Sequence, residues 1–381
     1  MRILKKLIYR MITLLISVIG LLIIAGILFM HFSPEFGGKP SEEAYSRYTQ
    51  SKHFKDGKFV NNGNVEMEMS AGDMFKAITG MMKTIPNSVP EENIATVKID
   101  SLDIVQFGSE TRLVWFGHST FLLQLDGKTI LIDPMFGEVP APHPLLGNKR
   151  FSKELPIEIE KLPAIDAVLI THDHYDHLDY GSIQKLKEKV NTFFTPLGVG
   201  AHLLAWGIDK KDIVEMDWWQ EENFEGLTIR CTPAQHFSGR GISDRAHTLW
   251  SSWIIQSPTA NLFFSGDSGY ADHFKEIGEE YGPFDLALME CGQYNELWPT
   301  VHMFPEQTAM AGQDVKAKTI MPIHWGAFKL SHHSWTDPVE RVSQKAKELN
   351  LNVITPRIGE PIVLDNIVIS QPDWWQLLGK E

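Results

Sequence analysis

The sequence predicts an α/β fold carried behind a single N-terminal membrane-spanning helix. Residues 11–30 form an uncharged apolar run that follows a basic start. From residue 112 onward, short apolar runs typical of buried strands are joined by turn dipeptides and an amphipathic helical segment. The chain has 381 residues, of which 43% are hydrophobic, so a sizeable core is available.

The N-terminal apolar run is the first predicted element. About 20 residues, each rising about 1.5 Å, span a bilayer core of about 30 Å. The run ends in bulky residues rather than a small-residue cleavage site, which favours an uncleaved anchor over a signal peptide. No later segment is long and apolar enough to span. We therefore expect a single-pass protein of the cell membrane, with a cytoplasmic N-terminus and the remaining chain on the other side. The basic residues that predict this orientation are Arg2, Lys5, Lys6 and Arg10.

Three regions follow from this pattern. We expect residues 1–32 to be a basic tail and transmembrane anchor, residues 33–106 a polar tether and N-terminal extension, and residues 107–381 a globular domain. A methionine-rich stretch of the extension repeats at helical spacing and predicts an amphipathic helix, which either joins the core or lines a lipid-accessible groove. Its members are Met74, Ile78, Met81 and Met82.

The globular domain is predicted to begin with a hairpin. Residues 112–116 and 121–132 are strand-like, and Asp126-Gly127 predicts a tight turn within the second run. The continuous apolar run over residues 167–170 is typical of a strand that is buried on both faces. The sequence therefore places a buried sheet early in this domain.

A helix and further strands are predicted after residue 180. Ile183, Leu186 and Val190 fall on one face of a helix over residues 182–190, whose other face is charged. The remaining strand-like runs cover residues 227–232, 261–264, 285–289 and 319–323. Strands of this kind, joined by helical and irregular segments, are typical of layered α/β enzymes.

Residues 171–179 carry the strongest chemical signal. They contain three histidines and three aspartates in nine positions, directly after a buried strand. Imidazole nitrogens and carboxylate oxygens are ligands suited to zinc. A loop leaving a strand can project His172 and His174 to one side while Asp176 and His177 turn to another, which supplies two adjacent metal positions. A solvated loop is the alternative, and the pattern H-x-H-x-D-H after an apolar strand argues against it.

Three other strand-like runs also lead into a histidine or an aspartate. These residues are His236, Asp267 and His324. Side chains at the ends of several strands can converge at one edge of a sheet. Each residue alone is as consistent with a loop-capping role as with a metal ligand. Together with the first motif, they complete a site.

These motifs resemble those of the metallo-β-lactamase superfamily, over roughly residues 107–365. The resemblance implies a four-layer αββα sandwich. Within the superfamily, the chain is similar to the phospholipases D that hydrolyse N-acyl-phosphatidylethanolamine, and to their bacterial relatives. The segments that carry this similarity are residues 115–120, 132–136, 236–241, 249–250 and 323–326.

The resemblance implies a pair of zinc ions, and every ligand position carries the expected residue type. It implies catalytic roles for Asp176, Asp267 and His302. His302 matches a substrate-contacting histidine, with a surface histidine as the alternative. The implied ligands are His172, His174 and His236 for the first ion, Asp176, His177 and His324 for the second, and Asp267 as a bridge between them.

Several polar residues near these motifs are predicted to have supporting roles. We expect His118 and Asp133 to brace loops beneath the metals rather than contact the substrate. For Asp173 and Asp179, partners of the ligands and solvated carboxylates are both open. We expect the pair His332 and His333 to lie at the surface.

Charge and cysteine content exclude other classes. A net charge of −13 argues against a nucleic-acid-binding surface, although bound metal ions can still attract a phosphate-bearing substrate. Cys231 and Cys291 are the only cysteines, which excludes a disulfide framework and a cysteine-rich zinc finger. Both lie in or after strand-like runs, so we expect buried free thiols rather than a disulfide.

The resemblance implies a phosphodiesterase of phospholipase D type acting on membrane lipids. Hydrolysis would release an alcohol such as an N-acylethanolamine and leave a phosphomonoester. A lactonase or another ester hydrolase on the same scaffold is the first alternative. A non-catalytic membrane-tethered scaffold is the second, and the complete ligand set argues against it. The oligomeric state stays open.

Overall fold

The secondary structure comes from a computed structural model that describes residues 2–63, 65, 72, 75, 76, 79, 80, 83, 85–108 and 110–378. The strands are β1 (Phe54–Lys55), β2 (Lys58–Phe59), β3 (Arg112–Trp115), β4 (Phe121–Leu125), β5 (Lys128–Ile132), β6 (Ile165–Leu169), β7 (Val190–Pro196), β8 (Ile213–Met216), β9 (Glu221–Phe224), β10 (Leu227–Thr232), β11 (Ser252–Gln256), β12 (Asn261–Phe264), β13 (Leu286–Glu290), β14 (Thr319–Ile323), β15 (Asn352–Val353) and β16 (Pro361–Val363).

Helices connect and cover these strands. The α-helices are α1 (Arg2–Phe32), α2 (Glu42–Tyr48), α4 (Ser101–Val105), α5 (Tyr180–Leu186), α6 (Gly200–Ala205), α7 (His273–Tyr281), α8 (Pro305–Asp314) and α9 (Asp337–Glu348). Short 3-10 helices are η1 (Pro34–Phe36), η2 (Pro144–Leu146), η3 (Ile159–Lys161), η4 (Lys210–Asp212), η5 (Leu364–Asn366) and η6 (Trp374–Gln376).

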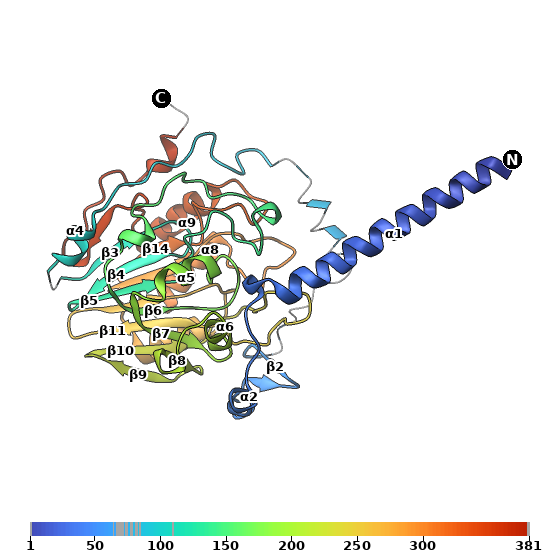
Figure 1. The fold of residues 1–381 in the computed structure, drawn as a ribbon. Helices are drawn as coiled ribbons and strands as arrows, with labels where there is room; N and C mark the ends of the chain where they lie inside the picture. The colour runs from blue at the N-terminus through green and yellow to red at the C-terminus, as the bar shows by residue number, and fades with distance from the viewer. Residues whose placement is uncertain are drawn as a thin grey trace.

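Two seven-stranded sheets form the middle of the molecule (Figure 1). One has the strand order β16-β3-β4-β5-β6-β7-β8, and the other has the order β15-β14-β13-β12-β11-β10-β9. Each sheet combines antiparallel pairs on one side with parallel pairs on the other. Helices α5 and α6 pack on the first sheet and helices α7, α8 and α9 on the second. This arrangement confirms the αββα sandwich that the resemblance implies.

Three hydrophobic clusters explain why the sheets are stacked this way. Trp115 and Phe264 belong to the cluster between the sheets, which is lined by both inner faces. Val168 packs with Ile183 beneath α5, and Ile320 packs with other apolar residues beneath the helices of the second sheet. Because the central strands are buried on both faces, they read as continuous apolar runs rather than alternating ones.

The predicted elements agree with the structure at most positions. The Asp126-Gly127 turn joins β4 to β5, and both residues have positive φ (46° and 75°), as a tight hairpin turn requires. β10, β12 and β14 have the predicted bounds. The prediction that Val190 continues the helix is wrong. Helix α5 ends at Leu186, and Val190 begins β7 and pairs with Ile165, because burial beside β6 outweighs helical periodicity.

The cysteine prediction is confirmed, since Cys231 and Cys291 are buried free thiols. The methionine-rich helix cannot be compared, since Met74, Ile78, Met81 and Met82 lie outside the described residues. The structure therefore says nothing about a groove formed by that stretch.

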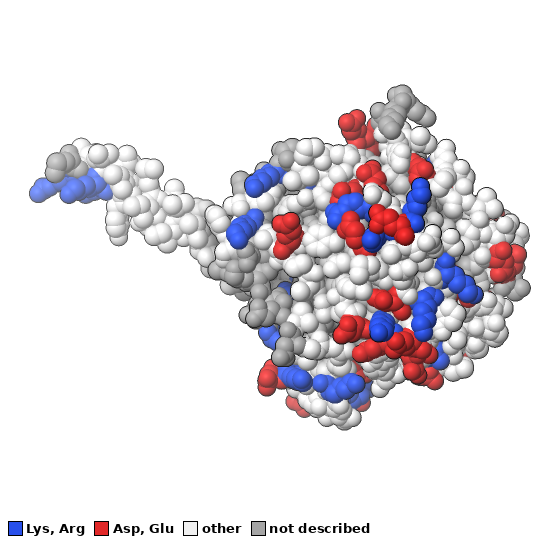
Figure 2. Space-filling view, turned by 180° about the vertical axis from the view of Figure 1, so that it is seen from behind, with Lys and Arg blue, Asp and Glu red and all other residues white. Residues whose placement is uncertain are grey.

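Helix α1 projects away from the sandwich (Figure 1) and has no buried residue. It contains 31 residues and has a mean hydropathy of 2.9 over its most apolar window, so it is long and apolar enough to cross a membrane. Figure 2 shows basic residues gathered at its far end. A signal sequence near the N-terminus can meet the same criteria of length and hydropathy.

The segment that follows α1 packs on the sandwich. Trp206 Nε1 donates a hydrogen bond to Pro34 O (2.7 Å), and Gly38 N donates one to His202 Nδ1 (3.0 Å). An added Cβ at Gly38 would lie 2.5 Å from Ala201 O, so this close approach requires glycine. The first part of the predicted tether is thus held against α6. The domain boundaries at residues 32 and 106 stay predictions.

Candidate metal centre

The loops that follow four strands bring the seven predicted ligands together. Asp267 follows β12 and His324 follows β14, while His236 lies beyond the end of β10. At Gly266 (φ 57°) an added Cβ would lie 2.6 Å from Ser251 O, so the sharp turn before Asp267 requires glycine. The remaining ligands follow β6 and are His172, His174, Asp176 and His177.

The first group of donor atoms contains three histidines and one carboxylate. His174 Nδ1 lies 2.9 Å from His172 Nε2 and 3.2 Å from His236 Nε2. Asp267 Oδ2 lies 3.8 Å from both His172 Nε2 and His236 Nε2. All four donor atoms lie within 4.8 Å of one another, so one cation fits among them.

The second group lies beside the first. Asp176 Oδ2 lies 3.1 Å from His324 Nε2 and 3.5 Å from His177 Nε2. The same carboxylate oxygen lies 2.8 Å from Nε2 of the fully buried His118. His118, Asp176, His177 and His324 therefore form a second cluster with the geometry of a cation site.

Asp267 lies between the two groups. Its Oδ2 is 3.1 Å from both His177 Nε2 and His324 Nε2, in addition to its contacts with the first group. Its Oδ1 is buried and has no hydrogen-bond partner among the described residues. A buried carboxylate oxygen that lacks a partner is costly unless a cation satisfies it. The donor set therefore fits two cations that share Asp267.

Burial and charge give the histidines different protonation behaviour. Burial among other histidines lowers the pKa of His172 and His236 well below the usual value, which keeps them neutral and able to coordinate a metal. Burial also lowers the pKa of His177 and His324, but Asp267 and the other carboxylates around each ring together outweigh it and raise both pKa values well above the usual value. A bound cation would take the place of these protons.

A layer of hydrogen bonds orients the rings. Asp133 Oδ2 accepts from His177 Nδ1 (2.7 Å), and its carboxylate also accepts from the amide and hydroxyl of Thr171. His236 Nδ1 donates to Val301 O (2.9 Å). Such contacts fix the tautomer and direct the other ring nitrogen toward the site. The position of Asp133 matches its predicted bracing role.

Hydrogen bonds from Arg240 hold the loop that carries the H-x-H-x-D-H motif, called the motif loop below. Arg240 Nη1 donates to Asp173 O (2.5 Å) and to Leu178 O (2.8 Å). The buried Asp173 carboxylate accepts from Gly239 N, and Asp179 caps α5 by accepting from Ser182 N. Neither aspartate is a freely solvated carboxylate.

His302 lies at the rim of the centre. Its ring stacks on His324 (centroids 5.2 Å apart) and lies 5.0 Å from the ring of His236. Its Nδ1 lies 3.0 Å from Oε1 of the fully buried Glu290, and Glu290 Oε2 accepts from Met303 N. The surface alternative for His302 is therefore excluded, and the role in catalysis stays a prediction.

Sequence reasoning missed several members of this site. Glu290 ends β13, so the search for strand ends that carry polar ligands could have found it. His118 offers a donor atom to the second group, which goes beyond the bracing role predicted for it. The surface prediction for His333 is wrong, because its ring stacks on Tyr294 and its Nε2 accepts from Gln293 N.

Comparisons with known proteins agree with this geometry. The family profile described as a Beta-lactamase superfamily domain matches residues 128–325. An uncharacterized protein of Mycobacterium tuberculosis is 37% identical over 354 residues, which cover 91% of this chain and 94% of that protein. N-acyl-phosphatidylethanolamine-hydrolyzing phospholipase D 1 of Caenorhabditis elegans is 32% identical over 276 residues, which cover 66% of this chain and 77% of that protein.

The fold has the same relationship to solved structures. A metallo hydrolase from the archaeon Ignicoccus hospitalis matches with a TM-score of 0.51 and 24% identity, over 66% of this chain and 97% of the other. At this identity the match shows the shared fold alone. The profile match and the similarity to the nematode enzyme extend it to the family. The chain therefore belongs to the metallo-β-lactamase superfamily of metal-dependent hydrolases.

Proposed function

We propose that this protein is a membrane-anchored di-zinc phosphodiesterase of phospholipase D type. The observation that carries the proposal is the position of Asp267 Oδ2, which lies 3.1 Å from the second group and 3.8 Å from the first. One carboxylate oxygen shared by two histidine-rich groups is the arrangement expected of a two-cation centre. Nitrogen and oxygen donors without a cysteine suit zinc.

The chemistry follows from the donor set and its surroundings. Two zinc ions held by these residues would supply hydroxide at neutral pH and offset the negative charge of a phosphodiester. Asp176 and Asp267 keep the centre anionic enough to retain the cations. His302, held by Glu290, is placed at the rim to transfer a proton to the departing alkoxide.

Two observations support a phospholipid substrate. The nematode relative is named for the hydrolysis of N-acyl-phosphatidylethanolamine, and it aligns with 66% of this chain. Helix α1 is long enough to span a bilayer and ends beside the centre, since Phe36 of the adjoining η1 contacts the ring of Tyr175 in the motif loop. We propose a single-pass anchor with the catalytic domain on the non-cytoplasmic side, where an anchored site has continuous access to lipid.

The test is hydrolysis by the purified full-length protein in detergent micelles. Wild type loaded with zinc should convert N-acyl-phosphatidylethanolamine to an N-acylethanolamine and phosphatidic acid. Asp267→Asn should lose activity by at least about 100-fold, because the bridge loses its charge. Metal content is measured in both proteins.

The possible outcomes test the substrate assignment and the metal bridge separately. If wild type carries two metals and forms neither product, the lipid assignment is wrong. A panel of lactones and soluble phosphodiesters then tests the other hydrolase activities of this scaffold. If Asp267→Asn retains both metals and full activity, the proposed bridge is wrong.

A further inference from the structure

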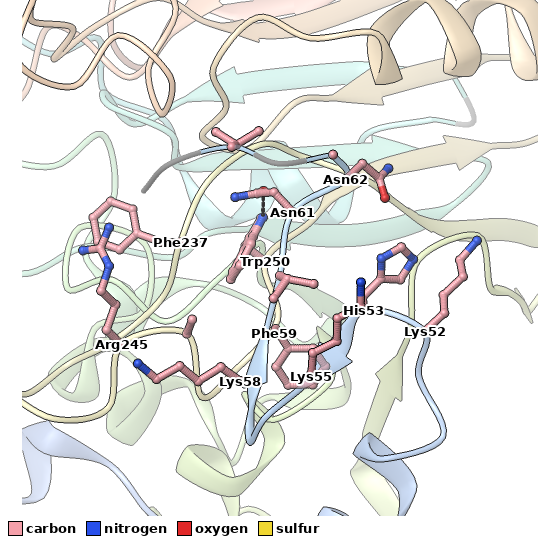
Figure 3. Close-up of a pocket in the computed structure, with 14 residues that line it drawn as sticks. Lys52, His53, Lys55, Lys58, Phe59, Asn61, Asn62, Phe237, Arg245 and Trp250 are labelled. Carbon is pink, nitrogen blue, oxygen red and sulfur yellow. Dashed lines mark hydrogen bonds between the residues drawn. The ribbon is translucent and has the colours of Figure 1, made fainter. Parts of the chain in front are cut away.

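A pocket of about 710 Å³ lies between hairpin β1–β2 and the loop that follows β10 (Figure 3). The hairpin belongs to the N-terminal extension, and the loop belongs to the catalytic domain. The pocket does not include any of the seven predicted metal ligands. Its described lining residues are Lys52, His53, Lys55, Lys58, Phe59, Val60, Asn61, Asn62, Gly63, Val65, Phe237, Arg245, Ala246 and Trp250.

The pocket is basic on an acidic protein. Its lining includes three exposed lysines and Arg245, and none of the 14 residues drawn is an aspartate or glutamate. Figure 3 shows Lys58 and Arg245 extending toward the same end and Lys52 lying at the other, beside His53. A concave surface lined by one sign of charge focuses its field on ligands of the opposite sign. With a net charge of −13 for the whole chain, this cluster is a local exception.

The pocket shares a wall with the metal centre. Asn61 Nδ2 donates to His236 O (2.9 Å), and Asn61 Oδ1 accepts from His236 N (3.1 Å) and Trp250 Nε1 (3.0 Å). The ring of Phe237 lies 4.7 Å from the ring of His174, and the Arg245 guanidinium lies 3.8 Å from the centroid of the Phe237 ring. A group bound in the pocket therefore sits next to the centre but outside it.

His53 supplies a second indication that the pocket takes a ligand. It is only 6% exposed, and its Nε2 has no hydrogen-bond partner among the described residues. Its ring packs on Trp218, with centroids 4.3 Å apart. A buried polar atom without a partner in the wall of a pocket indicates that a ligand or water completes it.

We propose that this pocket binds the phosphate of an anionic phospholipid headgroup, beside the lipid whose phosphodiester is cleaved. The proposal rests on the proposed function, since it assumes a catalytic domain held at a bilayer. Hairpin strand β2 lies on the side of the body from which α1 projects (Figure 1). With α1 in a bilayer, lysines on this side of the body would be attracted to anionic headgroups, and ammonium groups bind phosphate as point charges.

Lysine acetylation measured by mass spectrometry tests the pocket directly. Full-length, metal-loaded protein in neutral detergent is treated with an amine-acetylating reagent in three conditions: with phosphatidylglycerol, with phosphatidylcholine, or with inorganic phosphate and no lipid. Phosphatidylglycerol should slow acetylation at Lys52, Lys55 and Lys58 by about fivefold relative to phosphatidylcholine. Lys347, an exposed lysine on α9, should react equally in all three.

A matched pair of variants gives a functional readout. Lys55→Gln/Lys58→Gln should weaken partition into phosphatidylglycerol micelles and raise KM for the lipid by about tenfold or more, with little change in kcat. Lys347→Gln should behave as wild type.

If the pocket lysines are acetylated equally with both lipids, or if Lys347 is protected as much as they are, the pocket does not bind the headgroup and the proposal is wrong. If inorganic phosphate protects the lysines and phosphatidylglycerol does not, the pocket binds a soluble anion, and the proposal of a lipid headgroup is wrong. If wild type cleaves no lipid while the pocket lysines are protected by phosphatidylglycerol, the proposed function fails and the headgroup site stands.

Discussion

Glu290 illustrates how a residue outside the predicted ligand set can shape the site. Its carboxylate is fully buried, accepts from Met303 N, and lies 3.0 Å from His302 Nδ1. It also lies 3.6 Å from Nδ1 of the predicted ligand His324. One carboxylate therefore supports both a predicted ligand and the histidine proposed to transfer a proton, which makes it a positioning residue.

We expect His302→Asn to lower kcat by about 100-fold or more, because a general acid at the leaving group is lost. Glu290→Gln should lower kcat by about tenfold with KM unchanged, because Gln has one acceptor oxygen and cannot serve both His302 Nδ1 and Met303 N. The measurement is steady-state release of N-acylethanolamine from N-acyl-phosphatidylethanolamine, whose alkoxide leaving group needs a proton, with metal content determined for each protein. A fall in metal content parallel to kcat would mean that Glu290 acts through His324 instead.

Zinc affinity should rise with pH. In the metal-free protein the carboxylates hold the pKa of His177 and His324 well above the usual value, so both rings keep their protons below that raised pKa. A cation must displace these protons, and its affinity should therefore increase by about tenfold per pH unit for each proton displaced. Competition with a chelator at pH 6, 7 and 8 measures it. A pH-independent affinity would contradict the protonation states.

At the scale of elements, the motif loop depends on Arg240. Its guanidinium donates to three backbone carbonyls, those of Asp173, Leu178 and Glu35, and lies 4.1 Å above the ring of Tyr175. This one side chain connects the loop after β6 to η1. The N-terminal segment and the motif loop are therefore stabilised together.

Arg240→Met should destabilise the protein by on the order of 3 kcal/mol, since several carbonyls lose a charged donor. Arg47→Met is the matched control. Arg47 also connects the extension to the sandwich, but it is 47% exposed in its ion pair with Glu215, so its loss should cost less than about 1 kcal/mol. Urea unfolding of both variants gives the comparison. Equal losses would show that Arg240 is not a special contact.

The sequence predicts an element correctly where neighbouring residues determine its conformation, and fails where residues distant in sequence determine it. The H-x-H-x-D-H loop and the Asp126-Gly127 turn are encoded by neighbouring residues, so the sequence predicts them well. Val190 was misassigned because pairing with Ile165, distant in sequence, decides its conformation. The lysines of the basic pocket lie in a segment predicted as tether. Only folding brings them beside Arg245.

The sequence predicts the metal-ligand set for a related reason. Its members follow buried strands, and strand ends meet at one edge of a sheet. His118 was harder to recognise as a possible donor, because only the folded chain shows its Nε2 at 2.8 Å from Asp176 Oδ2. In the folded chain, His118 lies in the tight turn after β3 and has a φ of 56°.

At the scale of the whole molecule, we expect the proposed anchor α1 to be separable from the sandwich. No residue of α1 is buried. We expect removal of residues 2–32 to leave the Tm of the sandwich and the hydrolysis of bis(p-nitrophenyl) phosphate unchanged. Hydrolysis of lipid in vesicles should fall by about tenfold or more, because the effective concentration at the bilayer is lost. Flotation with vesicles measures attachment, and a truncated protein that still floats quantitatively would contradict the anchor.

The short passage from α1 to η1 has a kinetic consequence. Phe29, within α1, already contacts the ring of Phe36, and Phe36 contacts Tyr175 of the motif loop. Because this connection is short, an enzyme anchored by α1 as proposed would reach lipid only in the adjacent leaflet of its own membrane. It would not reach lipid in a neighbouring vesicle. Turnover should then follow the mole fraction of substrate in that leaflet rather than its bulk concentration. Diluting the lipid with an inert phospholipid would slow the enzyme, whereas diluting the whole suspension would not.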